Sequence, residues 1–320
     1  MTARRVLVIW NPNAGTKAGL PTNLAGEPEL REALEQAGVE FDLVRTDSGE
    51  AARTRVAAAL DEGWDVIAAA GGDGTAYAIA IQLLRRGSDG PVLGLLPLGS
   101  AMNLARTLGI PHDVDAAARI LADGEFRAID VGSVRDRPFF EIVAIGLGAE
   151  ALQRAQSIDR RRHWGAILEF VRLASRYRRT HIRLRLDDDR VVATRGLGLA
   201  VANAPTTGMH VAFAPDARLD DGLLEVVLHE GVGPWGLVAT LLRAVVTRPR
   251  GRFRSWRTRR IAIEARRPLA VYADGQDIGT TPVTVSLDPA ALRVVVPRIG
   301  ERGDLPVIAG RSAPIGTAAP

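Results

Sequence analysis

The chain has 320 residues, of which 47% are hydrophobic and 24% are charged, a composition typical of a soluble globular protein with one large domain or two. It contains no cysteine, which excludes disulfides, thiolate metal sites and cysteine nucleophiles and fits a reducing cytoplasm. The formal net charge is +4, Lys17 is the only lysine, and no apolar run reaches the roughly 18 residues that a membrane-spanning helix needs.

Strands and helices are predicted to alternate through the first third of the chain. The run 6–10 is apolar and follows two arginines, but Asn11 and Pro12 end it too early for a signal peptide, so 5–10 is interpreted as the first strand. The expected strands are 5–10, 39–46, 64–67 and 91–96, and the expected helices are 27–37, 48–62, 76–84, 100–108 and 111–124. Repeated strand–helix units of this length indicate a doubly wound parallel sheet.

The stretch 71–75, Gly-Gly-Asp-Gly-Thr, lies where the third strand turns into a helix. Free backbone N–H groups and the positive end of the helix dipole face such a turn and suit it to bind phosphate, while glycines let the backbone approach a ligand closely. Asp73 would repel a phosphate unless a cation or a hydroxyl lies between them, which indicates Mg²⁺ chemistry. A tight turn with an Asp helix cap is the simpler alternative.

Two further loops follow strands of the same predicted sheet, at 11–15 and at 99–100. Ligands of doubly wound sheets bind beyond the carboxyl ends of the strands, so the convergence of three loops on one edge favours a ligand site there. The sequence has no Walker A motif and no Gly-x-Ser-x-Gly elbow, and its five histidines are too scattered for a helical zinc-binding pair.

The pattern changes after residue 128, because strands then follow one another mostly through turns. The expected strands are 129–134, 139–145, 181–186, 191–202, 224–228, 261–265 and 269–272, and the expected helices are 164–177 and 237–246. This predicts a nucleotide-type domain over 1–128 and a mainly antiparallel domain over 129–300. The Gly- and Pro-rich end, 301–320, is expected to be a flexible tail.

Arginines crowd between 154 and 185 and again between 243 and 260. Such runs are solvated faces, or they face anionic lipid or nucleic acid. The helix expected at 164–177 is amphipathic and basic, so it fits a membrane surface, although packing on a sheet is the commoner fate of such a helix.

Two carboxylate-bearing turns lie in the second domain. The loop 215–224 holds three aspartates and either binds Mg²⁺ or Ca²⁺ or forms an ordinary Asp-Gly turn. The Asp-Gly-Gln at 274–276 follows a strand, so Asp274 is either a general base at a cleft or part of a hairpin turn.

Together these loops resemble the catalytic domain of the diacylglycerol kinase family, the bacterial lipid kinases related to sphingosine kinases. The resemblance extends from about Val6 to about Pro297. Its motifs are 11–15, the stretch 71–75, the block 97–111 that begins Pro-Leu-Gly-Ser, the loop 214–224 and the turn 274–276. The stretch 71–75 also resembles the loops of NAD kinases and 6-phosphofructokinases, whereas 97–111 and 214–224 favour the lipid kinases.

The resemblance implies an α/β nucleotide domain and a β-sandwich-like second domain, with the active site in the cleft between them. It implies ATP-dependent transfer of the γ-phosphate to a lipid hydroxyl such as that of diacylglycerol, within phospholipid metabolism. Asp221 and the backbone oxygens of Arg218 and Leu223 would hold Mg²⁺, and Asp274 and Gln276 would lie by the lipid hydroxyl. The residues implied at ATP are Asn11, Pro12, Asn13, Ala14, Gly15, Thr46, Gly71, Gly72, Asp73, Gly74, Thr75, Ala76, Tyr77, Gly99 and Ser100.

Several positions depart from the family pattern. Gln276 stands where the family has a Glu and cannot act as a base, which shifts that role to Asp274 or Asp73. Met-Asn at 102–103 stands where the family commonly has Asn-Asp. Ala-Ile at 78–79 stands where a Glu is frequent in the family, and Ser100 stands where a Thr is usual.

These departures keep two alternatives open, a soluble-substrate kinase of the NAD kinase type and a nucleotide-binding regulator with weakened turnover. The expected partners are a lipid substrate and an anionic membrane surface, with a homodimer possible and no nucleic acid. The expected location is the cytoplasm, peripheral to the inner face of the membrane.

Overall fold

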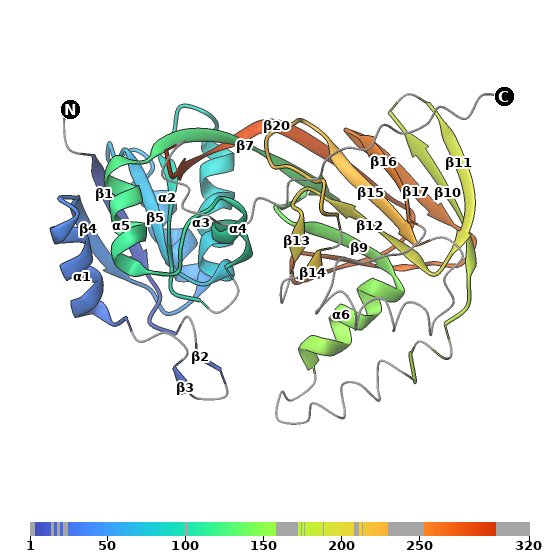
Figure 1. Cartoon of the computed structure of the whole chain (residues 1–320), viewed down its shortest axis with the longest axis horizontal. Helices are drawn as coiled ribbons and strands as arrows, with labels where there is room; N and C mark the ends of the chain where they lie inside the picture. The colour runs from blue at the N-terminus through green and yellow to red at the C-terminus, as the bar shows by residue number, and fades with distance from the viewer. Residues whose placement is uncertain are drawn as a thin grey trace.

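The structure, a computed structural model, describes residues 4–13, 16–17, 20–21, 25–99, 102–157, 172–173, 175, 177–187, 189–207, 211–212, 214–229 and 253–298. Its elements form two domains, and two long strands, β7 (Glu125–Val134) and β20 (Val283–Val296), run from one domain into the other (Figure 1).

A parallel sheet forms the core of the N-terminal domain, as the sequence predicts. It contains β1 (Arg5–Trp10), β4 (Glu40–Arg45), β5 (Val66–Gly71) and β6 (Val92–Pro97), in the order β6-β5-β1-β4. Every residue of β5 and β6 is buried, because helices cover both faces of the sheet. The helix α1 (Glu27–Gln36) packs on α5 (Val114–Asp123), and α2 (Gly49–Ala59) packs on α3 (Asp73–Arg86). The remaining described elements of this domain are β2 (Thr16–Lys17), β3 (Leu20–Pro21) and α4 (Asn103–Thr107).

The parallel sheet continues without a break into the second domain. Val294 of β20 pairs with Leu93 of β6 in parallel, and the other end of β20 pairs with β17 (Arg260–Ala265). The strands β10 (Thr180–Leu186) and β11 (Val191–Gly196) complete the path β11-β10-β17-β20-β6-β5-β1-β4. Off this path, β7 pairs with β20, and β8 (Arg137–Phe139) pairs with β7. The expected domain boundary at 128–129 falls inside β7, so the position of that boundary stays a prediction.

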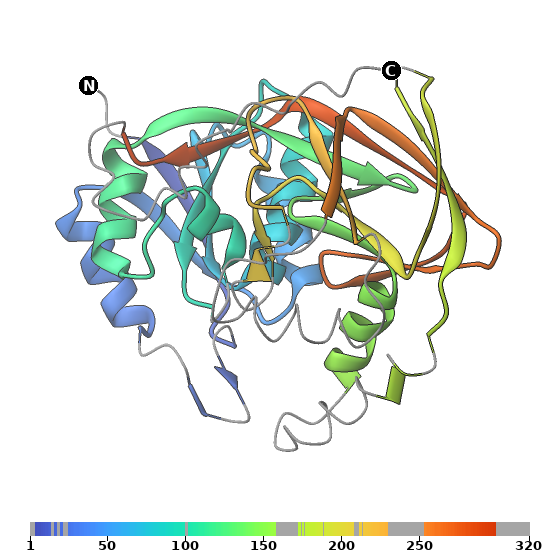
Figure 2. The ribbon, with the colours of Figure 1, turned by 45° about the vertical axis from the view of Figure 1, so that its right-hand side comes forward.

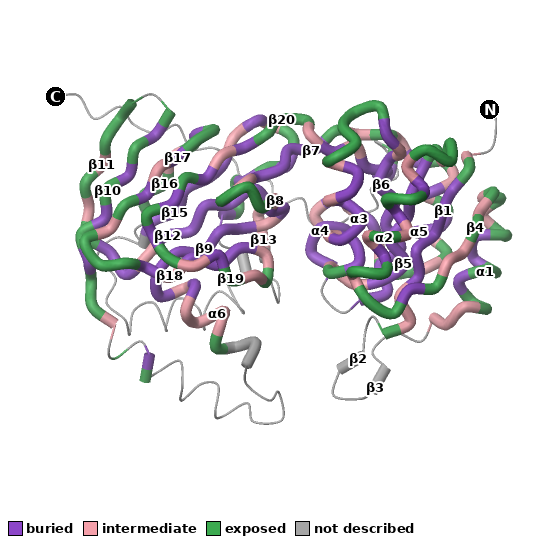
Figure 3. The backbone as a smooth tube through the Cα atoms, turned by 180° about the vertical axis from the view of Figure 1, so that it is seen from behind, coloured by how far each residue is buried: buried purple, intermediate pink, exposed green. Residues whose placement is uncertain are grey.

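A second, antiparallel sheet faces this one and completes the sandwich (Figure 2). Its strands are β9 (Ile142–Gly146), β12 (Gly198–Ala202), β15 (Leu224–His229), β16 (Phe253–Thr258), β18 (Ala270–Ala273) and β19 (Gln276–Thr280). Ile145 and Val201 of this sheet pack with Leu184 and Ile263 of the continuous sheet in one core. Figure 3 shows the buried residues running through both sheets.

The helix α6 (Leu147–Ser157) and the strands β16, β19 and β20 are not among the elements that the sequence predicts. α6 packs on β9 and β18, and β13 (Thr206–Thr207) pairs with β14 (Val211–Ala212) in a small hairpin. The helix expected at 164–177 lies mostly, and the one at 237–246 entirely, outside the described residues, as does the tail 301–320. Within the described part of the chain, no helix is both long and apolar enough to cross a membrane.

The prediction of one strand over 191–202 is wrong, because the chain changes sheets at Leu197. β11 belongs to the continuous sheet and β12 to the second sheet. Gly198 has φ +153°, and a Cβ atom there would lie 2.0 Å from the Ile145 carbonyl oxygen. A Cβ on Gly146, which has φ +84°, would lie 2.4 Å from the Leu197 oxygen. Only glycines permit two backbones to cross this closely.

We therefore predict that Gly198→Ala destabilises the protein by about 2 kcal/mol or more, since the added methyl group must push apart two backbones of the core. The control is Gly148→Ala in α6, whose Cβ would lie 3.9 Å from the nearest atom, the Ala144 Cβ. Helix propensity predicts a gain of about 0.5–1 kcal/mol for the control. Equal denaturation midpoints for the two variants would contradict the close crossing.

Candidate active site

The glycine stretch lies at the carboxyl end of β5, in contact with the loop that follows β6. β5 ends at Gly71 and α3 begins at Asp73, three residues earlier than the sequence predicts. The amides of Leu98 and Gly99 both donate to the Gly71 carbonyl oxygen at 3.0 Å. A Cβ on Gly99 would lie 2.6 Å from the Gly72 Cα, so the two loops touch through their backbones. This confirms that the two loops share one edge of the sheet.

Polar groups from the first and second strands reach the same edge. The Asn11 side chain lies beside Thr75, with its Nδ2 atom 3.4 Å from the Thr75 hydroxyl oxygen. The Thr46 amide donates to the Trp10 carbonyl oxygen at 2.8 Å, which places Thr46 at the end of β4 next to β1. Of the residues expected at ATP, Ala14, Gly15 and Ser100 lie outside the described residues.

Asp73 holds the two loops together with its carboxylate. Its two oxygens accept hydrogen bonds from the amides of Met102 and Asn103, each at 3.0 Å, and so cap the start of α4. Met102 has φ +43°, a backbone conformation that these bonds help to maintain. Burial raises the pKa of Asp73, and the two backbone donors oppose that rise. Asp73 therefore has a structural task at this turn, and its role toward Mg²⁺ stays a prediction.

Asp274 lies in a hairpin turn, as one interpretation of the sequence predicts. Ala273 pairs with Gln276, and the two turn residues, Asp274 and Gly275, have φ +39° and +85°. Asp-Gly suits such a turn because both central residues need positive φ. The turn places the half-buried Asp274 carboxylate against the segment between β8 and β9.

The Asp274 carboxylate accepts hydrogen bonds from three consecutive backbone amides. These belong to Phe140, to Glu141 at 3.1 and 3.2 Å, and to Ile142 at 2.9 Å. Burial raises the pKa of Asp274 to about 6, although these donors favour the ionised form, and the charge of Asp73 adds a smaller rise.

Glu141 connects the two domains, and sequence reasoning missed it. Its Oε2 atom accepts a hydrogen bond from Nδ2 of the buried Asn103 at 3.0 Å, and Arg106 donates to the Asn103 Oδ1. Hydrogen bonds thus run from Asp73 through Asn103 and Glu141 to Asp274. The one available signal was a lone charged residue inside the apolar run 139–145.

Tyr77 and Gln276 lie at the border of this network. The Tyr77 hydroxyl donates to the Pro138 carbonyl oxygen at 2.9 Å, and its ring meets Phe140 edge to face at 5.8 Å. Arg137 approaches Gln276, with its Nη1 atom 3.4 Å from the amide Oε1. The structure thus brings Asp73, Tyr77, Asp274 and Gln276 to one junction between the domains.

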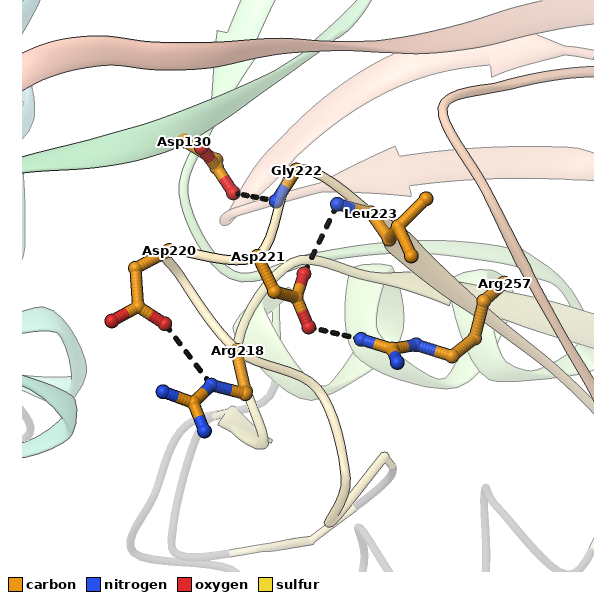
Figure 4. A network of polar contacts seen from close by, with 7 residues as sticks. All are labelled: Asp130, Arg218, Asp220, Asp221, Gly222, Leu223 and Arg257. Atoms are coloured by element: carbon orange, nitrogen blue, oxygen red, sulfur yellow. Dashed lines mark hydrogen bonds and ion pairs between the residues drawn. The ribbon is translucent and has the colours of Figure 1, made fainter.

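The loop proposed to hold Mg²⁺ is occupied by protein contacts (Figure 4). One Asp221 oxygen accepts from the Leu223 amide at 3.0 Å, and the other contacts the Arg257 guanidinium. Arg218 donates to Asp220 at 3.1 Å. Among the described residues no group of three or more histidines, aspartates or glutamates could hold a metal ion. A cation at this loop would have to displace Arg257, so the arrangement does not fit Mg²⁺ as it stands.

Glu225 lies behind that loop with its side chain almost fully buried. Its Oε2 atom has no hydrogen-bond partner among the described residues. Burial, followed by the charge of Asp216, raises the pKa of Glu225. A raised pKa keeps an unpaired buried carboxyl neutral unless a cation compensates its charge.

Comparisons with known proteins identify the family. A model described as the diacylglycerol kinase catalytic domain matches residues 5–134, and one described as the YegS C-terminal NAD kinase beta sandwich-like domain matches residues 141–296. A probable lipid kinase YegS-like protein of Pseudomonas aeruginosa is 32% identical over 285 residues, 85% of this chain and 91% of that protein.

A diacylglycerol kinase of Mycobacterium tuberculosis is 32% identical over 315 residues, 92% of this chain and 96% of that protein. The crystal structure of a putative diacylglycerol kinase from Bacillus anthracis has the same fold, with a TM-score of 0.72 at 19% identity, covering 92% of this chain and 96% of that one. The chain therefore belongs to the diacylglycerol kinase catalytic-domain family.

Proposed function

We propose that this protein is an ATP-dependent lipid kinase that transfers the γ-phosphate of ATP to a lipid hydroxyl such as that of diacylglycerol. The observation that carries the proposal is the hydrogen-bonded path from Asp73 through Asn103 and Glu141 to Asp274. It joins a phosphate-type turn on one domain to a carboxylate-bearing hairpin on the other. A kinase needs such a junction, because donor and acceptor must be held in line.

The nucleotide side of the proposed site is the edge formed by 71–75 and the loop 97–99. In the first turn of α3 the amides of Thr75 and Ala76 donate to the Gly72 carbonyl oxygen, whereas those of Asp73 and Gly74 have no helical acceptor, and Gly74 is exposed. These donors neutralise phosphate charge without needing to reorganise during the reaction. We extend the nucleotide site to Asn11, Thr46 and the loop positions expected from the family, with Mg²⁺ carried in as the partner of ATP.

The acceptor side is the hairpin that carries Asp274 and Gln276. Gln276 cannot take a proton, but its amide can hold a hydroxyl group by a hydrogen bond. The three backbone bonds of Asp274 favour a role in fixing the segment 140–142. A soluble acceptor such as NAD, and nucleotide binding without transfer, are the two alternatives that the experiment must separate.

The lipid substrate places the working protein at a membrane surface, and we propose peripheral contact with anionic lipid on the cytoplasmic face. The support is the 18 arginines of 154–185 and 243–260, of which 8 lie outside the described residues. Binding to anionic but not neutral vesicles in a flotation assay tests it. A homodimer remains a prediction that light scattering would check.

The direct test is transfer of labelled γ-phosphate from MgATP to lipid alcohols in mixed micelles, run beside the same reaction with NAD. We expect a labelled lipid and no labelled NADP. Labelled NADP alone would establish the soluble-substrate alternative. ATP binding in calorimetry, with transfer to neither acceptor, would establish the regulator.

Gly74→Ala separates nucleotide binding from folding. A Cβ at this exposed helical position would meet no protein atom within 4 Å, so stability should be unchanged or slightly higher. A methyl group facing bound phosphate should raise the Kd for MgATP about tenfold, equivalent to about 1.4 kcal/mol. Calorimetry beside a melting curve measures both effects, with Gly148→Ala as the distant control. Unchanged ATP affinity would remove 71–75 from the nucleotide site.

Asp274 should leave a pH signature in stability. Its pKa is raised from 3.8 to about 6 by burial, so between these pH values the native state holds more protons than the unfolded chain. Stability from this group is therefore present below about pH 4 and is lost as the pH rises toward 6, by on the order of 2 kcal/mol.

Asp274→Asn should remove that slope and be less stable than the wild type at low pH. The exposed control Asp288→Asn should keep the slope. Urea denaturation of the three proteins at pH 4, 5, 6 and 7 measures the effect. Parallel curves for wild type and Asp274→Asn would contradict the raised pKa.

A further inference from the structure

We propose that Glu141 is the general base of this site, the carboxylate that takes the proton of the acceptor hydroxyl. The inference rests on the proposed kinase function, which does not say which residue takes the proton of the acceptor hydroxyl. It comes from the position of Glu141 between the two domains and from the contacts of the neighbouring carboxylates.

The other groups at the junction are poorly suited to take a proton. Gln276 and Asn103 carry amides, which do not accept protons near neutral pH. Asp274 uses its carboxylate on three backbone amides and Asp73 uses its carboxylate on two. Burial raises the pKa of Asp274 to about 6, but protonation of either aspartate would weaken the bonds from backbone amides that hold the site in place.

Glu141 is held from three directions and is only half buried. Its amide is bound by Asp274, and its carbonyl oxygen accepts from the amides of Asn203 and Ala204 at 2.9 and 3.1 Å. Its carboxylate accepts a hydrogen bond from Nδ2 of Asn103. The Oδ1 atom of the same Asn103 side chain accepts a hydrogen bond from Arg106. The backbone at position 141 therefore cannot shift, and the carboxylate has a defined orientation, as a general base requires.

The Glu141 carboxylate lies between the nucleotide side and the acceptor side of the proposed site. On one side Asn103 links it to Asp73 and so to the loops 71–75 and 97–99. On the other side Asp274 links it to the hairpin with Gln276. An ATP whose phosphates lie along 71–75 and a hydroxyl held at the hairpin must meet between these two anchors.

The acceptor hydroxyl oxygen forms a bond to the γ-phosphorus, and the bond from that phosphorus to the β–γ bridging oxygen breaks. ADP leaves with the bonding electron pair. The hydroxyl proton moves to the Glu141 carboxylate and is later released to water, so the side chain returns to its starting state.

Glu141→Gln tests the role, because glutamine keeps an oxygen that can accept from Asn103 but cannot take a proton. We expect kcat for lipid phosphorylation to fall about 10²-fold or more, with the Kd for MgATP and the melting temperature unchanged. The residual activity should also lose the acid limb of the wild-type pH–kcat/KM profile. Glu264→Gln, the same change at an exposed position of β17, should match the wild type.

Gln276→Glu distinguishes Glu141 from a site that lacks a base. If Glu141 is the base, this variant should give no gain in kcat, because the new carboxylate only replaces an amide that holds the hydroxyl, whereas a missing base predicts a rise toward the about 10²-fold gain of general base catalysis. Such a rise would overturn the assignment. It would also be overturned if Glu141→Gln kept more than half of the wild-type kcat, or lost activity only through ATP affinity or stability.

The same assay separates this inference from the proposed function. If the wild-type protein labels no lipid while a known lipid kinase does, both the proposed function and the role of Glu141 are wrong. If wild type and Glu141→Gln label lipid equally well, only the role of Glu141 is wrong.

Discussion

Hydrogen bonds that carboxylates accept from backbone amides fix the segments on each side of the domain junction. Asp73 holds the start of α4 against the glycine stretch, and Asp274 holds the segment 140–142 against its own hairpin turn at 273–276. Asp130, 3% exposed, does the same between the loop at Gly222 and the middle of β20. Charge-assisted bonds of this kind are stronger than neutral ones, and losing one partner leaves buried donors without acceptors.

This use of carboxylates narrows the chemistry that each can perform. A carboxylate surrounded by amide donors is stabilised as an anion and is a good anchor, but it gives up those bonds when it accepts a proton. Burial acts in the opposite direction, and at Asp274 burial dominates, so its pKa rises to about 6. The hydrogen bonds by which Asp274 holds the segment 140–142 therefore change in strength with pH. Counting acidic residues near the junction therefore does not identify a base, because the backbone partners of each carboxylate also affect how readily it takes a proton.

The sequence predicted the local parts of this arrangement and missed the long-range ones. The apolar run at β5, the glycines after it and the Asp-Gly turn at 274–275 each report nearby backbone geometry, and the structure confirms their placement. The pairing of β20 with β6 joins residues about 200 positions apart, which no local periodicity encodes. The sheet change at Leu197 depends on a backbone crossing with Gly146, and the tasks of Asp73 and Glu141 depend on partners in other segments.

The continuous sheet also limits how far the domains can move apart. Residues 283–286 of β20 pair with β17 and Val294 pairs with β6, with an irregularity between Asp288 and Leu292 in its pairing with β7. A free irregularity at that point would be a natural bending site. Asp130 lies opposite it and bonds the amide of Ala290 at 2.8 Å and that of Gly222 at 2.7 Å. The bend is thereby fixed to a third segment, which favours a junction whose geometry is set by the fold before any substrate binds. For phosphoryl transfer, where positioning supplies most of the catalysis, such a preset junction lowers the entropic cost of aligning donor and acceptor.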